Sequence, residues 1–180
     1  MIRVHCHGVR AAGVCRFAAF CERFIKVPKG TGALTALRLR DWQRGLVGSV
    51  LDAEVQHALR GGVLPRGNGK STLVASWVLH ELMEGGEGAT VVVDERQAGI
   101  VFNIARRMVE LSDELADRVH VYKYRLVVPS RGATFACLPA TPAGLEGLDY
   151  TLAVCDEIGV LTRWPGKPSR WRRASVSAPP

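Results

Sequence analysis

The chain has 180 residues, of which 47% are hydrophobic and 23% charged, the balance of an ordinary soluble domain with a core of its own. Its net charge is +7, but five basic residues follow Leu161 without an acidic one, so charge alone argues only weakly for nucleic-acid binding. No apolar run approaches the roughly 20 residues that cross a bilayer, and the N-terminus lacks the apolar region of a secretory signal. Five scattered cysteines do not suggest a disulfide framework, so we expect a protein of the reducing cytoplasm.

The first half of the chain contains three predicted helices. One covers about residues 15–27 and ends at the break over 28–32. A second lies within 37–51, where apolar residues are spaced as on one helix face and Asp41 is a candidate N-cap. Residues 57–64 can form a strand, although Gly61 and Gly62 weaken that prediction, and residues 71–84 predict a strongly amphipathic helix.

Strands and helices alternate in the second half. The apolar run 89–94 has the pattern of a buried parallel strand, and residues 96–112 predict the next helix. Residues 120–128 and 133–139 indicate two strands of a hairpin joined by the turn "PSRG". The run 151–157 indicates another apolar strand that ends in two acidic residues. This alternation predicts an α/β fold with a parallel sheet flanked by helices.

A phosphate-binding loop is indicated just before the third helix. Gly69, Lys70 and Ser71 match the end of the pattern G-x-x-x-x-G-K-[ST], but Leu64 stands where the first glycine is expected. Gly67 and Gly69 can supply the positive φ angles that such a loop needs, and the amides of the following helix would face the phosphates. Lys70 would reach the β- and γ-phosphates, and Ser71 would place its hydroxyl on Mg²⁺. By itself the tetrapeptide "NGKS" is more often an ordinary helix start.

Two further features bear on the same chemistry. Asp156 and Glu157 follow an apolar strand, where the first would hold Mg²⁺ through water and the second would polarise the attacking water. Two acids after a strand are common in turns, but together with the loop they favour a nucleotide site. Gln43 could read adenine, because its amide both donates and accepts hydrogen bonds. The alternative is a surface glutamine beside a half-buried Trp42.

Taken together, these features resemble the large terminase subunit of tailed bacteriophages, from about Phe17 to Val160. The resemblance rests on four stretches that match in order and spacing: "FCERFIKVPKGTGALTALRLRDWQ", "PRGNGKST", "VVVDERQAGIVFNIARRMVEL" and "LPATPAGLEGLDYTLAVCDEIGV". The second stretch is similar to the family's variant phosphate loop, which lacks the first glycine, carries an arginine early and usually has Lys where Gly67 stands. The set is specific, whereas each piece alone is not.

The resemblance implies a P-loop ATPase core of the RecA-like (ASCE) kind, part of a motor that uses Mg-ATP to drive double-stranded DNA into a capsid. It implies nucleotide contacts from one upstream residue and the loop: Gln43, Arg66, Gly67, Asn68, Gly69, Lys70, Ser71 and Thr72. It further implies Ser71 and Asp156 as Mg²⁺ ligands, Glu157 as the catalytic carboxylate and Arg66 as a group that stabilises charge on the γ-phosphate. The implied partners are phage DNA, the small terminase subunit, the portal protein and a homo-oligomeric ring, without a membrane, in the cytoplasm of an infected or lysogenic bacterium.

The resemblance also divides the chain. We expect an N-terminal helical region over 1–36, a partial ATPase core over 37–161, and a basic tail over 162–180 that is disordered or out of frame. The coupling motif and nuclease domain of the family have no counterpart in the sequence. We therefore expect a fragment, as from a frameshifted or decayed prophage gene, that does not package DNA. Two alternatives stay open: a fragment of another P-loop helicase or translocase, and a non-catalytic product.

Overall fold

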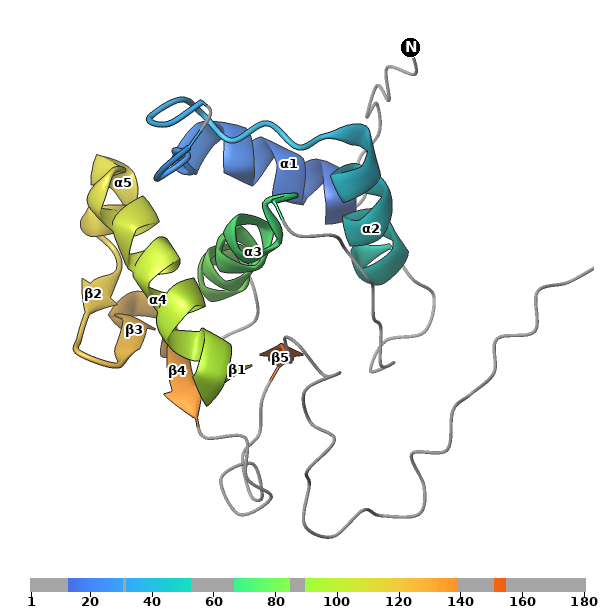
Figure 1. Ribbon diagram of the computed structural model, residues 1–180. Coiled ribbons are helices and arrows are strands. Elements are labelled where there is room, and N and C mark those ends of the chain that lie inside the picture. The colour runs from blue at the N-terminus through green and yellow to red at the C-terminus, as the bar shows by residue number, and fades with distance from the viewer. Residues whose placement is uncertain (1–12, 31, 53–66, 85–89, 139–150, 155–180) are drawn as a thin grey trace, which may run out of the picture.

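The computed structural model describes residues 13–30, 32–52, 67–84, 90–138 and 151–154 (Figure 1). The helices are α1 (Gly13–Phe24), α2 (Asp41–Leu51), α3 (Lys70–Glu84), α4 (Glu95–Glu110), α5 (Asp113–Ala116) and the 3₁₀ helix η1 (Pro129–Arg131). The strands are β1 (Thr90–Asp94), β2 (His120–Val121), β3 (Arg125–Val128), β4 (Ala133–Leu138) and β5 (Leu152–Val154). The predicted helices and the predicted strands over 89–94, 133–139 and 151–157 are confirmed within these ranges. The single strand predicted over 120–128 is wrong, because the chain turns at residues 122–125 and forms two antiparallel strands, β2 and β3. The predicted strand over 57–64 lies outside the described residues.

The strands form one mixed sheet in the order β2-β3-β4-β1-β5. β1 pairs in parallel with both β4 and β5, so that Val92 faces Ala136 on one side and Ala153 on the other. β3 pairs antiparallel with β4, and Gly132 completes the turn between them with a φ of +62°. The predicted α/β fold is therefore confirmed, and the predicted hairpin is confirmed for residues 125–128 and 133–136 on either side of the turn. The parallel part of the described sheet consists of β4, β1 and β5.

The helices form two layers over this sheet. Figure 1 shows α3 and α4 side by side above the strands, with α1 and α2 on the far side of α3. α3 is consequently buried on nearly all sides, and Val78, Leu79 and Leu82 are fully excluded from solvent. An apolar helix of this kind is stable only inside a core. α1 contacts both α2 and α3, and so connects the two helices.

The ends of α1 and α2 meet at a tight contact. The Asp52 carboxylate, at the end of α2, accepts hydrogen bonds from the amides of Gly13 and Val14 at the start of α1. A Cβ at Gly13 would lie 2.8 Å from the Cβ of Leu51, so only glycine allows this approach. The contact joins α1 to α2 across the predicted domain boundary at residue 36, and the division of the chain at that residue stays a prediction.

Two cysteines lie on α1. Cys15 is disulfide-bonded, whereas Cys21 is a free thiol whose pKa is raised to about 12, first by burial and then by the nearby Glu22 carboxylate. One disulfide is not a framework of several, so the predicted compartment stays a prediction. Among the described residues, no helix has the length and apolar character needed to cross a membrane.

Candidate functional site

The loop that leads into α3 turns through two glycines in the left-handed region. Gly67 has a φ of +83° and Gly69 a φ of +75°, the positive values that the sequence analysis expected. A Cβ at Gly67 would meet no atom within 4 Å, so the backbone conformation rather than a lack of space favours glycine there. α3 begins at Lys70, and the first donation into the loop runs from Leu73 N–H to Gly69 O at 2.9 Å. The first amides of the helix therefore point out of its N-terminal end, beside the loop.

Gln43 connects the start of α2 to this loop. Its side chain is only 7% exposed, and its Oε1 accepts a hydrogen bond from the Arg40 amide at 2.9 Å. Its Nε2 lies 3.9 Å from the position that a Cβ at Gly69 would occupy. The predicted N-cap, Asp41, is wrong by one residue, because Arg40 is the N-cap and Asp41 lies in the first helical turn. Gln43 is the third residue of α2, and its reach back to the N-cap amide stabilises the beginning of the helix.

A cavity of about 670 Å³ opens between the loop and the segment that precedes α2. On one side it is lined by Gly67, Asn68, Gly69, Thr72 and Leu73, with Gln43 beside them. The opposite side is a reverse turn closed by hydrogen bonds from Val27 N–H to Thr35 O at 2.9 Å and from Leu34 N–H to Val27 O at 2.8 Å. The volume is within the range of small-molecule sites, roughly 300–1,000 Å³.

The second wall of the cavity is cationic. Lys29, Arg38 and Arg40 belong to its lining, and no carboxylate is among the described residues that form it. These three residues were not predicted from the sequence as part of a site. A signal was present in the alternation over 37–40, since Leu37 and Leu39 are buried while the two arginines between and after them are exposed, as in an extended segment with one face on the core. The cavity is therefore suited to an anion.

The structure brings together some of the predicted residues and leaves others undescribed. Lys70 and Ser71 are half-buried in the first turn of α3, between lining residues Gly69 and Thr72. β5 lies parallel beside β1, and its described part ends at Val154. The remaining predicted residues lie outside the described part of the chain: Arg66, Asp156 and Glu157. Within the described part, no group of three or more His, Cys, Asp or Glu side chains could hold a metal ion.

Comparison with known proteins gives consistent matches. The family described as "Terminase large subunit, ATPase domain" matches residues 42–168. The "Terminase, large subunit" of Enterobacteria phage HK97 is 31% identical over 151 residues, which are 80% of this chain and 30% of that protein. The crystal structure of the HK97 bacteriophage large terminase is similar with a TM-score of 0.68 at 30% identity, covering 79% of this chain and 30% of the other. The chain thus spans about 30% of the length of these relatives.

Proposed function

The chain belongs to the terminase large subunit family, within its ATPase region, and we propose that it binds Mg-ATP as part of a DNA-packaging motor. The observation that carries this proposal is the cavity between the glycine loop and the cationic wall. A polyphosphate requires backbone donors, positive charge and the exclusion of carboxylates, and the described lining offers all three. The parallel strands β4, β1 and β5 under α3 support a RecA-like P-loop fold for the core.

The phosphates are assigned to the loop side. Gly67, Asn68 and Gly69 line the cavity immediately before the N-terminus of α3, where helix amides and the helix dipole favour negative charge. Lys70 follows directly and is assigned to the β- and γ-phosphates, with Thr72 beside them. In this arrangement the two positive-φ glycines let the backbone approach the ligand closely.

The base is assigned to the side of Gln43. Because Gln43 Oε1 already accepts from the Arg40 amide, the Nε2 donors and the second lone pair of Oε1 are the groups left for adenine. The buried position of Gln43 fixes their direction, so the amide is oriented before the ligand arrives. We therefore assign to Gln43 a contact with adenine in which Nε2 donates the main hydrogen bond.

The metal and the hydrolysis step are assigned by family membership. Ser71, in the first turn of α3, and Asp156, two residues beyond β5, are the proposed Mg²⁺ ligands. The metal ion, when bound, neutralises charge on the phosphate oxygens. Glu157 is assigned to orienting and polarising the attacking water, and Arg66 to stabilising negative charge on the γ-phosphate.

The wider partners are also proposals. Duplex phage DNA, the small terminase subunit, the portal protein and a homo-oligomeric ring would be the assembly in which the ATPase cycle does work. The proposed compartment is the cytoplasm of an infected or lysogenic bacterium.

Calorimetric titration of the purified chain with Mg-ATP tests the proposal. We expect saturable binding by the parent chain, and a loss of at least tenfold in affinity for Lys70→Ala because the phosphate-contacting ammonium is removed. Lys123→Ala makes the same change on the exposed β2–β3 hairpin, outside the residues that line the cavity, and should bind as the parent does. Glu157→Gln should retain binding and lose hydrolysis. A folded parent chain that binds no Mg-ATP would overturn the proposal.

A further inference from the structure

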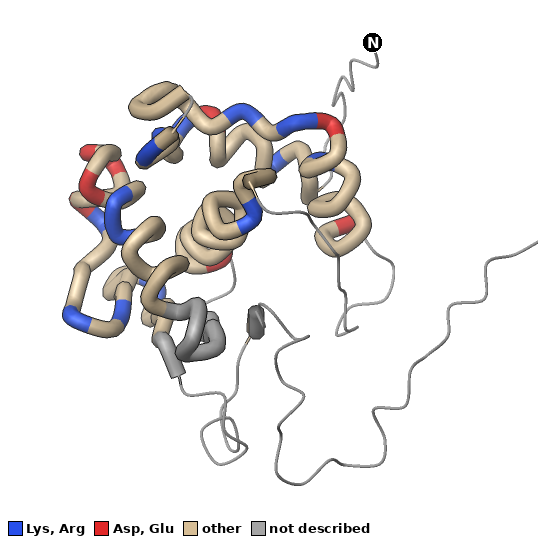
Figure 2. Tube along the Cα trace, viewed as in Figure 1, with Lys and Arg blue, Asp and Glu red and all other residues tan. Residues whose placement is uncertain are grey.

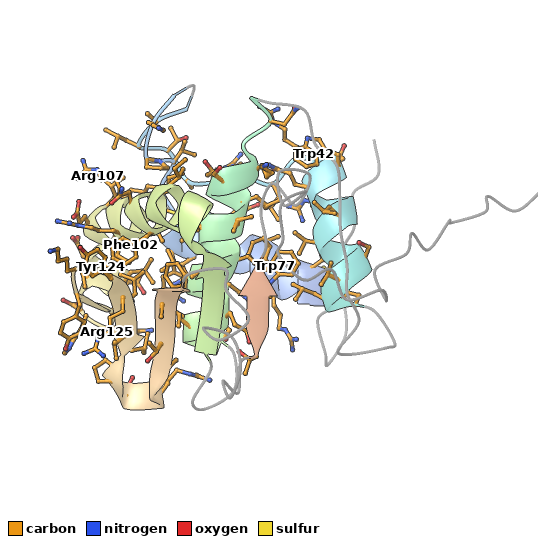
Figure 3. All side chains as sticks on the ribbon, turned by 60° about the horizontal axis from the view of Figure 1, so that its bottom comes forward. Trp42, Trp77, Phe102, Arg107, Tyr124 and Arg125 are labelled. Carbon is orange, nitrogen blue, oxygen red and sulfur yellow. The ribbon has the colours of Figure 1, made fainter. Side chains whose placement is uncertain are left out.

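The tip of the β2–β3 hairpin exposes two tyrosines. Tyr122 N–H donates to Arg125 O at 2.9 Å, which leaves Lys123 and Tyr124 as a two-residue turn. Tyr122 is 46% exposed and Tyr124 65% exposed, so both rings are open to solvent. Figure 3 shows Tyr124 and Arg125 at the outer margin of the molecule. Arg125 begins β3, the strand next to the edge strand β2 of the described sheet.

A cationic side chain lies over each of the two exposed rings. The Arg125 guanidinium lies 4.8 Å from the centroid of the Tyr122 ring, and the Lys123 ammonium lies 5.0 Å from that of Tyr124. Such contacts restrict long, flexible side chains at the surface. The hairpin tip therefore presents two positive charges in defined positions.

The strands next to the tip carry no carboxylate. Residues 119–128 contain two Lys or Arg side chains and no acidic one: Lys123 and Arg125. The surface arginines of α4 differ, since Arg106 and Arg107 both pair with Glu110, at 2.8 and 3.1 Å. Within the described residues, neither Lys123 nor Arg125 forms a salt bridge. Figure 2 shows the blue positions of this hairpin set apart from the red ones of α5.

The tip has a definite place in the sheet. Arg125 is in register with Ala136, in the second half of β4, while the turn at η1 lies beside the beginning of β4. Since β4 is parallel to β1 and β5, the tip lies at the edge toward which the three parallel strands run. This is the edge where ligand sites of α/β sheets are built.

The geometry points to the hairpin tip, residues 122–125, as a surface that contacts the phosphate backbone of duplex DNA. Two cations that form no salt bridge with the described residues can each contact a phosphate, and the tyrosine hydroxyls are further donors to phosphate oxygens. A four-residue tip falls far short of the roughly 800 Å² per partner that a stable protein interface buries, whereas phosphate contacts add individually. The inference rests on the proposed function only in taking DNA as the partner.

Fluorescence anisotropy with a labelled mixed-sequence DNA duplex, over a salt series, tests the inference on the full chain. The test variant is Lys123→Gln with Arg125→Gln, and the matched control is Arg106→Gln with Arg107→Gln, which removes the same charge from α4. All three chains keep the basic residues after Leu161, so these residues contribute equally. We expect the test variant to bind roughly tenfold more weakly and to lose about 2 from the slope of log affinity against log salt, the value for two phosphate contacts. The control should change the slope by less than half as much.

Three outcomes would overturn the inference. Equal losses in both double variants would mean that only net charge matters, and a test variant that binds as the parent does would remove the hairpin from the contact. An unchanged DNA affinity with altered self-association in sedimentation velocity would assign the tip to a protein partner instead. Failure of the proposed function is seen separately, as a parent chain that does not bind Mg-ATP in calorimetry. Circular dichroism of each variant establishes that the fold is retained.

Discussion

His80 is expected to make the stability of this protein depend on pH between about 6.5 and 4. The side chain lies on α3, between the rings of Phe17 and Phe20, with centroid separations of 5.2 and 5.3 Å and nearly perpendicular planes. Only 8% of the residue is exposed, and neither ring nitrogen has a hydrogen-bond partner among the described residues. Burial, assisted by the nearby Arg16 charge, lowers the pKa of His80 from 6.5 to about 4.

The sign and size of the effect follow from the two pKa values. Because the folded-state pKa lies below the unfolded one, the unfolded chain takes up the proton first as the pH falls. The stabilising contribution of the uncharged His80 to the free energy of unfolding is complete above pH 6.5 and is lost as the pH falls toward 4. The difference between the unfolded-state and folded-state pKa values of His80 corresponds to about 3 kcal/mol, which is a large share of the stability of a single domain.

His80→Leu isolates this contribution. Leucine has a similar volume and leaves no unpaired nitrogen in the core, so the variant should be at least as stable as the parent near pH 7. Between pH 6.5 and 4 the parent should lose about 3 kcal/mol more than the variant. Urea unfolding followed by circular dichroism at a series of pH values measures the difference. His120→Leu, on the exposed strand β2, is the matched control and should keep the parent's dependence. A His80→Leu variant with the same pH dependence as the parent would refute the reasoning.

Three further predictions concern the cavity. Gly69→Ala should lower the free energy of unfolding by about 1–2 kcal/mol and weaken Mg-ATP binding, because alanine is strained at a φ of +75°. The control Gly45→Ala lies inside α2 with open space around it, and should raise the free energy of unfolding by about 0.5–1 kcal/mol. Thermal unfolding measures both. Equal stabilities of the two variants would contradict this. Gln43→Glu keeps the acceptor for the Arg40 amide but loses the Nε2 donor. Helix content should therefore persist, while the affinity for Mg-ATP measured by calorimetry falls roughly tenfold. An undiminished affinity would mean that Gln43 does not contact the base. Arg38→Gln should weaken Mg-ATP binding several-fold at low salt and much less at about 1 M salt, where charges are screened. An affinity equal to the parent's at low salt would contradict a role of the cationic wall in binding the nucleotide.

Much of the fold could be predicted because its signals are local. The apolar spacing of 71–84 and of 96–112 produced α3 and α4, and the run over 89–94 produced β1. The turn at 129–132 predicted the β3–β4 hairpin, since Gly132 supplies the left-handed residue that closes it. Gly67 and Gly69 likewise adopt the positive φ that their place before a helix indicated.

The candidate site shows what only the tertiary structure decided. The sequence by itself assigned Gln43 and the loop at Gly69 to one nucleotide site. Their proximity across more than twenty residues depends on tertiary packing, in which α1 contacts both α2 and α3. Lys29 and Arg38 became part of the cavity only because the turn over 27–36 folds back against the loop. Periodicity and turn chemistry act over a few neighbouring residues, so they determine elements. Which charged side chains share a cavity depends instead on the packing of distant segments, which no local pattern records.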